Sequence, residues 1–265
     1  MKNTISAIII LLFPAFILAQ NFQGKVTYEW KASSEEFRKN TIQPDMPPEM
    51  KKFLERKMEL IFHKIYTLGF DKSSSIYKEE RKMTATGDDF VPNISDNGVN
   101  IAYFKDVRAK ELVVQKEFYT KYFTIKEPLE NFNWKLESET KKIGDYLCYK
   151  ATAIVPFKKL TYEDEEDKST NFFVKQKIIE RTVTAWYAPE ISVSQGPENY
   201  WGLPGLILEI NDGNAVTLCT KIVMNPKEKV LIKPLGKGKI VSQKEYDAIV
   251  LKKNKERQET ETTPD

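Results

Sequence analysis

The sequence predicts a mainly β protein, a curved antiparallel sheet with one or two helices covering its open side. The first observation is that apolar and polar side chains alternate with a period of two, as in residues 25–30 and 123–126. Strands with one buried face are typical of antiparallel sheets. The second is that successive strand-like segments are separated by short connections, without a strand–helix–strand rhythm, which favours a meander.

Further strands are indicated by runs of β-branched and aromatic residues bounded by turn residues. A hairpin is expected where Gly69 and Asp71 separate two such runs. We expect strands near residues 25–30, 60–70, 73–79, 101–107, 111–117, 123–126, 134–137, 145–155, 175–187, 206–210 and 216–222.

Two helices are expected. The first begins at Asp45, Pro47 and Pro48, and its apolar residues recur at helical spacing. These residues are Met50, Phe53, Leu54 and Met58. The second covers about residues 244–253, because Ser242 and Glu245 form a capping box before it. Its inner face is expected to contain Tyr246, Ile249 and Val250.

The N-terminus has the features of a signal peptide. Lys2 precedes an apolar run over residues 5–18, which ends at the small residue Ala19. The run is shorter than the ~20 residues that a spanning helix needs. We therefore expect cleavage of residues 1–19 near Gln20, no transmembrane anchor afterwards, and a periplasmic or secreted location. Residues 20–253 are expected to form one domain, and residues 254–265 a polar, disordered tail.

The composition narrows the classes of partner. The chain contains 41 Lys and Arg against 38 Asp and Glu, so its charge is nearly balanced. No basic patch interleaved with aromatic residues stands out, so nucleic acid is not an expected partner. Apolar residues make up 41% of the chain, enough for a sizeable core.

The two cysteines, Cys148 and Cys219, leave two interpretations open. An oxidising compartment would permit a disulfide, and each cysteine lies on the more polar face of its predicted strand. Their separation of 71 residues matches no metal or redox motif. The sequence therefore allows either a bridge or two free structural thiols.

Catalytic machinery is not recognisable. His63 is the only histidine, and its apolar surroundings indicate a half-buried structural residue rather than a catalytic base. There is no zinc-type cysteine spacing and no phosphate-binding glycine loop, so no metal and no cofactor are expected. The acidic run 163–167 is expected to be a solvated hairpin tip. The carboxylates left for acid–base chemistry are Glu190, Glu198, Glu209 and Asp212.

The most unusual segment is residues 186–213, where about 17 residues rich in Pro and Gly connect two strands. Pro204 and Gly205 predict a type II turn with positive φ at Gly205, after which Leu206, Leu208 and Ile210 would share a buried face. The connection is either an ordered binding loop or an aromatic plug for the open end of the sheet. The candidate ligand- or partner-binding residues are Trp186, Tyr187, Glu190, Glu198, Tyr200 and Trp201.

The same segment carries a family resemblance. Gly202, Leu203, Pro204, Gly205, Leu206 and Ile207 spell the string that names the GLPGLI family, and residues 144–151 are similar to an earlier block of that family. The resemblance implies an exported Bacteroidetes protein of uncharacterised function, with no catalytic residues to carry over. Family members encoded near outer-membrane receptors suggest an envelope role. An analogy with the half-barrel of periplasmic lipoprotein carriers fits the consecutive strands and short helices.

These observations favour a non-enzymatic binding or chaperone-like module, with an apolar small molecule or an outer-membrane or other envelope protein as its partner. A hydrolase using carboxylates near the GLPGLI loop and a structural envelope component are the alternatives. A deep polar pocket in which Glu190 or Glu198 faces another carboxylate would favour the hydrolase.

Overall fold

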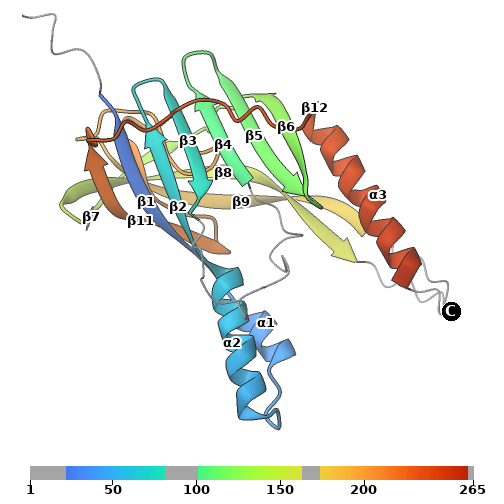
Figure 1. Cartoon of the computed structure of the whole chain (residues 1–265). Coiled ribbons are helices and arrows are strands. Elements are labelled where there is room, and N and C mark those ends of the chain that lie inside the picture. Colours follow the sequence, from blue (N-terminus) through green and yellow to red (C-terminus); the bar gives the residue numbers. More distant parts are fainter. Residues whose placement is uncertain (1–21, 81–100, 163–173, 262–265) are drawn as a thin grey trace, which may run out of the picture.

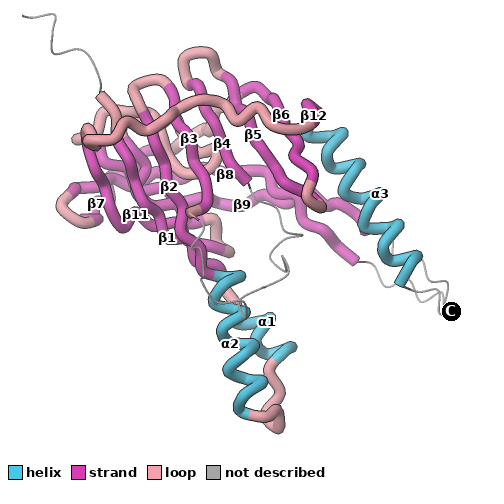
Figure 2. Tube along the Cα trace, viewed as in Figure 1, coloured by secondary structure: helices cyan, strands magenta, loops and turns pink. Residues whose placement is uncertain are grey.

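The computed structural model describes residues 22–80, 101–162 and 174–261, which form a single twelve-stranded sheet and three helices (Figures 1 and 2). The prediction of a mainly β fold is confirmed. The predicted signal peptide and the acidic run 163–167 lie outside the described residues.

The strands follow the predicted order closely. They are β1 (Gly24–Ala32), β2 (His63–Phe70), β3 (Ser74–Glu79), β4 (Ile101–Asp106), β5 (Glu111–Phe118), β6 (Lys121–Pro128), β7 (Lys135–Ile143), β8 (Tyr146–Tyr162), β9 (Val174–Ala188), β10 (Leu206–Asn211), β11 (Ala215–Met224) and β12 (Lys239–Val241). Their order in the sheet is β12-β6-β5-β4-β3-β2-β1-β11-β10-β9-β8-β7. The sheet is thus two antiparallel meanders joined where β1 pairs with β11. Among the described strands, only β12, which was not predicted, pairs in parallel, with β6.

The link between β6 and β7 shows how strongly the sheet curves. These strands are ten steps apart in the sheet, which would be about 48 Å if the sheet were flat. Only residues 129–134 connect them, and a chain of that length reaches about 25 Å. The two ends of the sheet therefore face each other, and in Figure 1 β8 and β9 pass behind β3–β6.

Helix α2 (Pro48–Phe62) begins where the sequence predicts but does not cover the sheet. It projects away from the strands together with α1 (Glu35–Thr41), as Figure 1 shows. Met50 and Phe53 are 49% and 44% exposed, and Met58 is the buried residue of the helix. The helix also includes residues 60–62, which were expected to be strand. The helical spacing was correct, but the helix contacts β1 and β2 without lying over the sheet, and it packs beside α1, where Phe37 lies 5.6 Å from Phe62 between ring centroids.

Helix α3 (Gln243–Glu261) confirms the predicted capping box. The Ser242 backbone N–H donates to Oε2 of Glu245 over 2.7 Å, and the Glu245 N–H donates to Oγ of Ser242 over 3.2 Å. Tyr246 is buried against Phe118 and Phe123 at the β6 side of the sheet. The helix continues to Glu261, well past residue 253, through residues that were predicted to be disordered.

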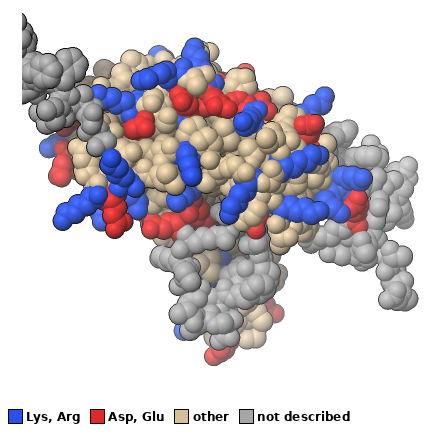
Figure 3. All heavy atoms as spheres, turned by 45° about the horizontal axis from the view of Figure 1, so that its top comes forward, with Lys and Arg blue, Asp and Glu red and all other residues tan. Residues whose placement is uncertain are grey.

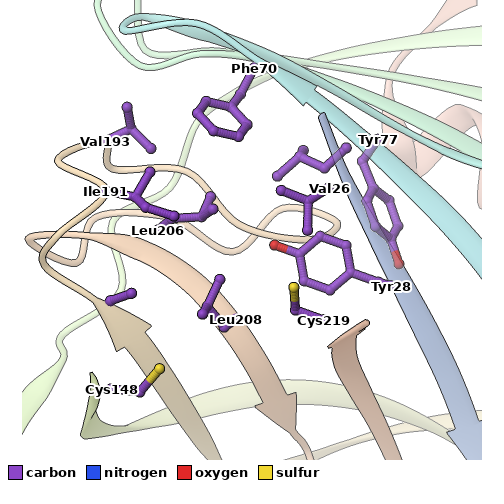
Figure 4. Close-up of a cluster of buried hydrophobic side chains, with 12 residues drawn as sticks. Val26, Tyr28, Phe70, Tyr77, Cys148, Ile191, Val193, Leu206, Leu208 and Cys219 are labelled. Atoms are coloured by element: carbon purple, nitrogen blue, oxygen red, sulfur yellow. The ribbon is translucent and has the colours of Figure 1, made fainter. Parts of the chain in front are cut away.

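The centre of the sheet is buried on both faces. Leu206 and Leu208 belong to one hydrophobic cluster, whereas Ile207 and Ile210 belong to a second. The expected shared face of Leu206, Leu208 and Ile210 is therefore wrong, because the register of β10 shifts between Ile207 and Glu209. Figure 4 shows the first cluster, in which Tyr28 lies beside Val26, Tyr77 and Cys219. The Tyr28 hydroxyl donates to the Ile207 carbonyl over 2.6 Å.

Candidate functional site

The connection between β9 and β10, residues 189–205, is folded back against the opposite half of the sheet. Ser75 of β3 donates its hydroxyl to Oε1 of Gln195 over 2.7 Å. The Leu206 and Ile207 N–H groups donate to carbonyls within the connection itself, at residues 191 and 195. We call residues 189–205 the interior loop. It is held by both meanders and packs as part of the core.

Lys105 of β4 holds the interior loop in place through hydrogen bonds. Its side chain is fully buried, and Nζ donates to the carbonyls of Gly196, Glu198 and Tyr200 over 2.6, 2.7 and 2.8 Å. An ammonium group has three N–H donors, so all of them are used. Burial lowers the pKa of Lys105 to about 7, and the nearby Glu198 carboxylate opposes that shift. Three loop carbonyls thus depend on one buried cation.

Glu198 lies beside this ammonium group in a strained backbone conformation, with φ of 49°. Burial raises the pKa of Glu198 to about 7, repulsion from Asp212 adds to the rise, and Lys105 opposes it. Burial, followed by the charge of Glu198, raises the pKa of both Tyr77 and Tyr103. The Tyr77 hydroxyl is buried and has no hydrogen-bond partner among the residues that the structure describes. Glu198 is therefore a carboxyl group whose raised pKa brings its ionisation close to neutral pH, and the tyrosine hydroxyls of Tyr77 and Tyr103 feel its charge.

The raised pKa of Glu198 predicts a pH-dependent stability. The ordinary value is 4.5, so between about pH 4.5 and 7 the folded state binds more protons than the unfolded state. This group therefore stabilises the fold at pH 5, and its contribution is lost as the pH rises through 7. Glu198→Gln should lose less stability than wild type between pH 5 and 7, measured by urea unfolding, with the exposed Glu180→Gln as control. Equal losses in wild type and Glu198→Gln would contradict the assignment.

Tyr200 and Trp201 contribute differently to the interior loop. Tyr200 is buried with Leu203 in the second cluster, where its ring lies 5.2 Å from that of Phe132. Trp201 is half-buried, and its Nε1 donates to the Glu130 carbonyl over 2.7 Å. In return, Nε1 of Trp134 donates to the Trp201 carbonyl over 2.8 Å. The predicted aromatic plug therefore corresponds to Tyr200. Trp201 instead connects the interior loop to residues 129–134, the link between β6 and β7.

Gly205 is required for a reason other than the one expected. Its φ is not positive, whereas that of Gly202 is 94°. A Cβ at residue 205 would lie 2.4 Å from the Ala188 carbonyl oxygen. The predicted positive φ at Gly205 is therefore wrong, because Gly202 adopts the left-handed conformation while Gly205 allows close approach to β9.

A surface pocket lies at the other end of the interior loop. It has a volume of about 350 Å³ and is lined by Leu147, Tyr149, Tyr187, Pro189 and Glu190. Tyr187 is buried, whereas Leu147, Pro189 and Glu190 are exposed, so Tyr187 lies at the base of an opening to solvent. We call this the Tyr149–Tyr187 pocket. Its volume falls within the range of small-ligand sites.

The six candidate residues thus occupy separate places. Tyr187 and Glu190 line the pocket, Tyr200 lies in the second cluster, Glu198 is half-buried beside Lys105, and Trp201 contacts the β6–β7 link. Trp186 lies beneath Nζ of Lys141, 4.4 Å from its ring centroid, and Lys141 pairs with Glu209 over 2.7 Å. A single convergent site is therefore not formed by these six residues.

Both cysteines are buried in the first hydrophobic cluster as free thiols (Figure 4). Their expected position on a polar face is wrong, because Ile191 and Val193 of the interior loop belong to the cluster that encloses them. Burial raises the pKa of Cys148 to about 11 and that of Cys219 to about 12. The thiols are therefore protonated at neutral pH, which makes them poor nucleophiles.

His63 begins β2 directly after α2. Its Nε2 lies 2.6 Å from a Glu29 carboxylate oxygen, and its Nδ1 lies 2.6 Å from one of Glu59. The histidine therefore links the projecting helix to the sheet.

Within the described ranges, no group of three or more His, Cys, Asp and Glu side chains is placed to hold a metal, and no helix is long and apolar enough to cross a membrane. Basic and acidic side chains are intermingled on the face in Figure 3.

Comparison with known proteins gives a family model and a fold similarity. The model of a family described as a protein of unknown function (Porph_ging) matches residues 134–209, which include the pocket and the interior loop. Two solved structures of PNGF-II, in space groups C2 and P21, align with 88% of this chain at 15% identity, with TM-scores of 0.50 and 0.49. The chain spans about a third of the length of those structures, and at this identity the likeness concerns the fold alone. No curated protein matches the chain.

Sequence reasoning missed Lys105, Leu147 and Tyr149. Lys105 shares a face of β4 with Ile101 and Tyr103, but lysine is almost never fully buried unless it is paired, so the sequence did not indicate its burial. Tyr149 belongs to the pocket because it is the cross-strand partner of Tyr187. Knowing which residues of β8 and β9 pair would have placed Tyr149 beside Tyr187, but the sequence does not determine that pairing.

Proposed function

We propose that the protein is an exported, non-enzymatic binding module of the GLPGLI type. It holds a mainly apolar ligand, or an apolar group of an envelope-protein partner, in the Tyr149–Tyr187 pocket. The observation that carries this proposal is the pocket itself, which is open to solvent, about 350 Å³ in volume and walled by aromatic and aliphatic side chains. Its base belongs to the paired strands β8 and β9, where Tyr149 lies opposite Tyr187.

The test is native mass spectrometry of protein purified from the envelope of its own host. Leu147 is 39% exposed and lines the pocket, so Leu147→Trp should fill it with little effect on the fold. Leu136→Trp is the matched control, because Leu136 is 55% exposed on β7 and does not line the pocket. We expect a bound ligand or partner with wild type and Leu136→Trp, and its loss with Leu147→Trp. Equal retention by both variants would exclude this pocket, and a wild-type chain that is always free would contradict the proposal.

The same spectra test export. The mass of the mature chain should correspond to a start at Gln20 or within two residues of it. A chain that retains Met1 would contradict a cleaved signal peptide.

A carboxylate hydrolase is a second candidate, favoured by one observation. Burial, with repulsion from Asp212 adding to it, raises the pKa of Glu198 to about 7, so this carboxyl group can hold a proton near neutral pH, as a general acid requires. If this candidate holds, a hydrolytic activity will fall by at least about a hundredfold in Glu198→Gln. It will also show a pH profile that follows Glu198. Activity that is unchanged in this variant would exclude the role.

A further inference from the structure

The Tyr149–Tyr187 pocket combines two features that recognise one chemical class. It brings two phenol rings and one carboxylate to the same opening, between aliphatic walls formed by Leu147 and Pro189. Aromatic faces carry negative electrostatic potential, and they bind ammonium groups by cation–π attraction. We propose that this pocket is selective for an organic ammonium group, an inference that rests on the binding function proposed above.

The rings are placed by strand pairing. Tyr149 and Tyr187 are directly opposite each other in β8 and β9, and their ring centroids lie 6.1 Å apart with planes tilted by 35°. Cross-strand neighbours of this kind form one continuous aromatic surface. A cation above the midpoint between the two rings lies within the attractive range of both centroids, about 6 Å.

Glu190 supplies the negative charge. It is exposed, and its Oε1 accepts a weak hydrogen bond from the Leu147 N–H over 3.4 Å. Among the described residues, none of the ion pairs involves Glu190. The carboxylate is thus available to a cationic ligand.

Two of the lysines on β7 and β8 are paired with other carboxylates. Lys141 pairs with Glu209 over 2.7 Å, and Lys150 contacts Glu139 and Glu137 over 2.8 and 3.2 Å. These contacts keep positive side chains engaged with other carboxylates. A ligand that is neutral throughout would leave the Glu190 carboxylate facing an apolar group, which costs solvation free energy. A ligand with an ammonium head and an aliphatic body satisfies both the carboxylate and the rings.

The test compares choline with its uncharged isostere 3,3-dimethylbutan-1-ol, in titrations of the full mature chain followed by NMR signals of Tyr149 and Tyr187. We expect choline to bind about fivefold more tightly or better, a ratio typical of cation–π recognition at a partly exposed site. Glu190→Gln should bring the ratio of the choline and alcohol affinities close to one, because it removes the carboxylate that favours the cation. The matched control is Glu180→Gln, because Glu180 is an exposed carboxylate on β9 outside the pocket. This variant should behave as wild type.

The outcomes separate this inference from the proposed function. Equal binding of choline and the alcohol would overturn ammonium selectivity while leaving an apolar binding pocket intact. Binding of neither probe at Tyr149 and Tyr187 would overturn both. Nα-acetyl-lysine N-methylamide provides a further arm: if it displaces choline, the source is a lysine side chain of a partner, and if it does not, the source is a quaternary ammonium compound. Either result supports ammonium selectivity only if choline binds more tightly than the alcohol.

Discussion

Replacing Lys105 by Met should destabilise the folded protein by about 3–5 kcal/mol, as for a buried charge network that loses one member. Methionine fills a similar volume and removes the cost of burying the ammonium group. However, it leaves the carbonyls of Gly196, Glu198 and Tyr200 without their donor, and each unsatisfied buried carbonyl costs about 1–3 kcal/mol. The interior loop should then detach from β4.

Urea unfolding at pH 7 is the appropriate measurement. Lys126→Met is the matched control, because Lys126 is an exposed lysine in a strand of the same meander. It should change the stability by less than about 0.5 kcal/mol. If Lys105→Met and Lys126→Met unfold at the same urea concentration, Lys105 does not fasten the loop.

Gly205→Ala should cost about 3 kcal/mol, although a single methyl group is added. The new Cβ would lie 2.4 Å from the Ala188 carbonyl oxygen and 2.7 Å from the Pro189 nitrogen. Both neighbours are backbone atoms at the end of β9, so β9 and β10 would have to separate where their pairing begins. A flexible side chain could move aside, but the paired backbone of two strands cannot.

Gly236→Ala is the control for this change. Nothing lies within 4 Å of the position that its Cβ would occupy, so the substitution should be close to neutral. Thermal unfolding of the two variants gives the comparison. If Gly205→Ala melts within a degree or two of wild type, the close approach of β9 to residue 205 is wrong.

The succession of strands along the chain could be predicted because short-range signals determine where each strand begins and ends. Alternation in residues 25–30 and 123–126 and the turn at Asp71 are local patterns, and the structure contains each of them. The capping box at Ser242 is equally local, since it depends on side chains three residues apart. Such features need no knowledge of which strands meet.

The candidate site was less predictable because it depends on contacts between distant parts of the chain. Lys105 is buried by residues more than 90 positions later, and the Tyr149–Tyr187 pairing depends on the register between two strands. The bulge in β10 reversed the facing of Ile210, and a one-residue shift of that kind leaves no signal in hydrophobic alternation. The resemblance in residues 202–207 located the important loop but not the reason for its glycine.

The junction of the two meanders also constrains when the protein can fold. β1 pairs locally with β2, but its other edge is filled by β11, and Gly24 lies opposite Met224. About two hundred residues must therefore be available before the first strand is covered on both sides. Contacts of such large sequence separation form late and slowly. An N-terminal strand that cannot be completed until nearly the whole chain has emerged leaves the sheet unfinished throughout synthesis, a state that the export proposed above would require.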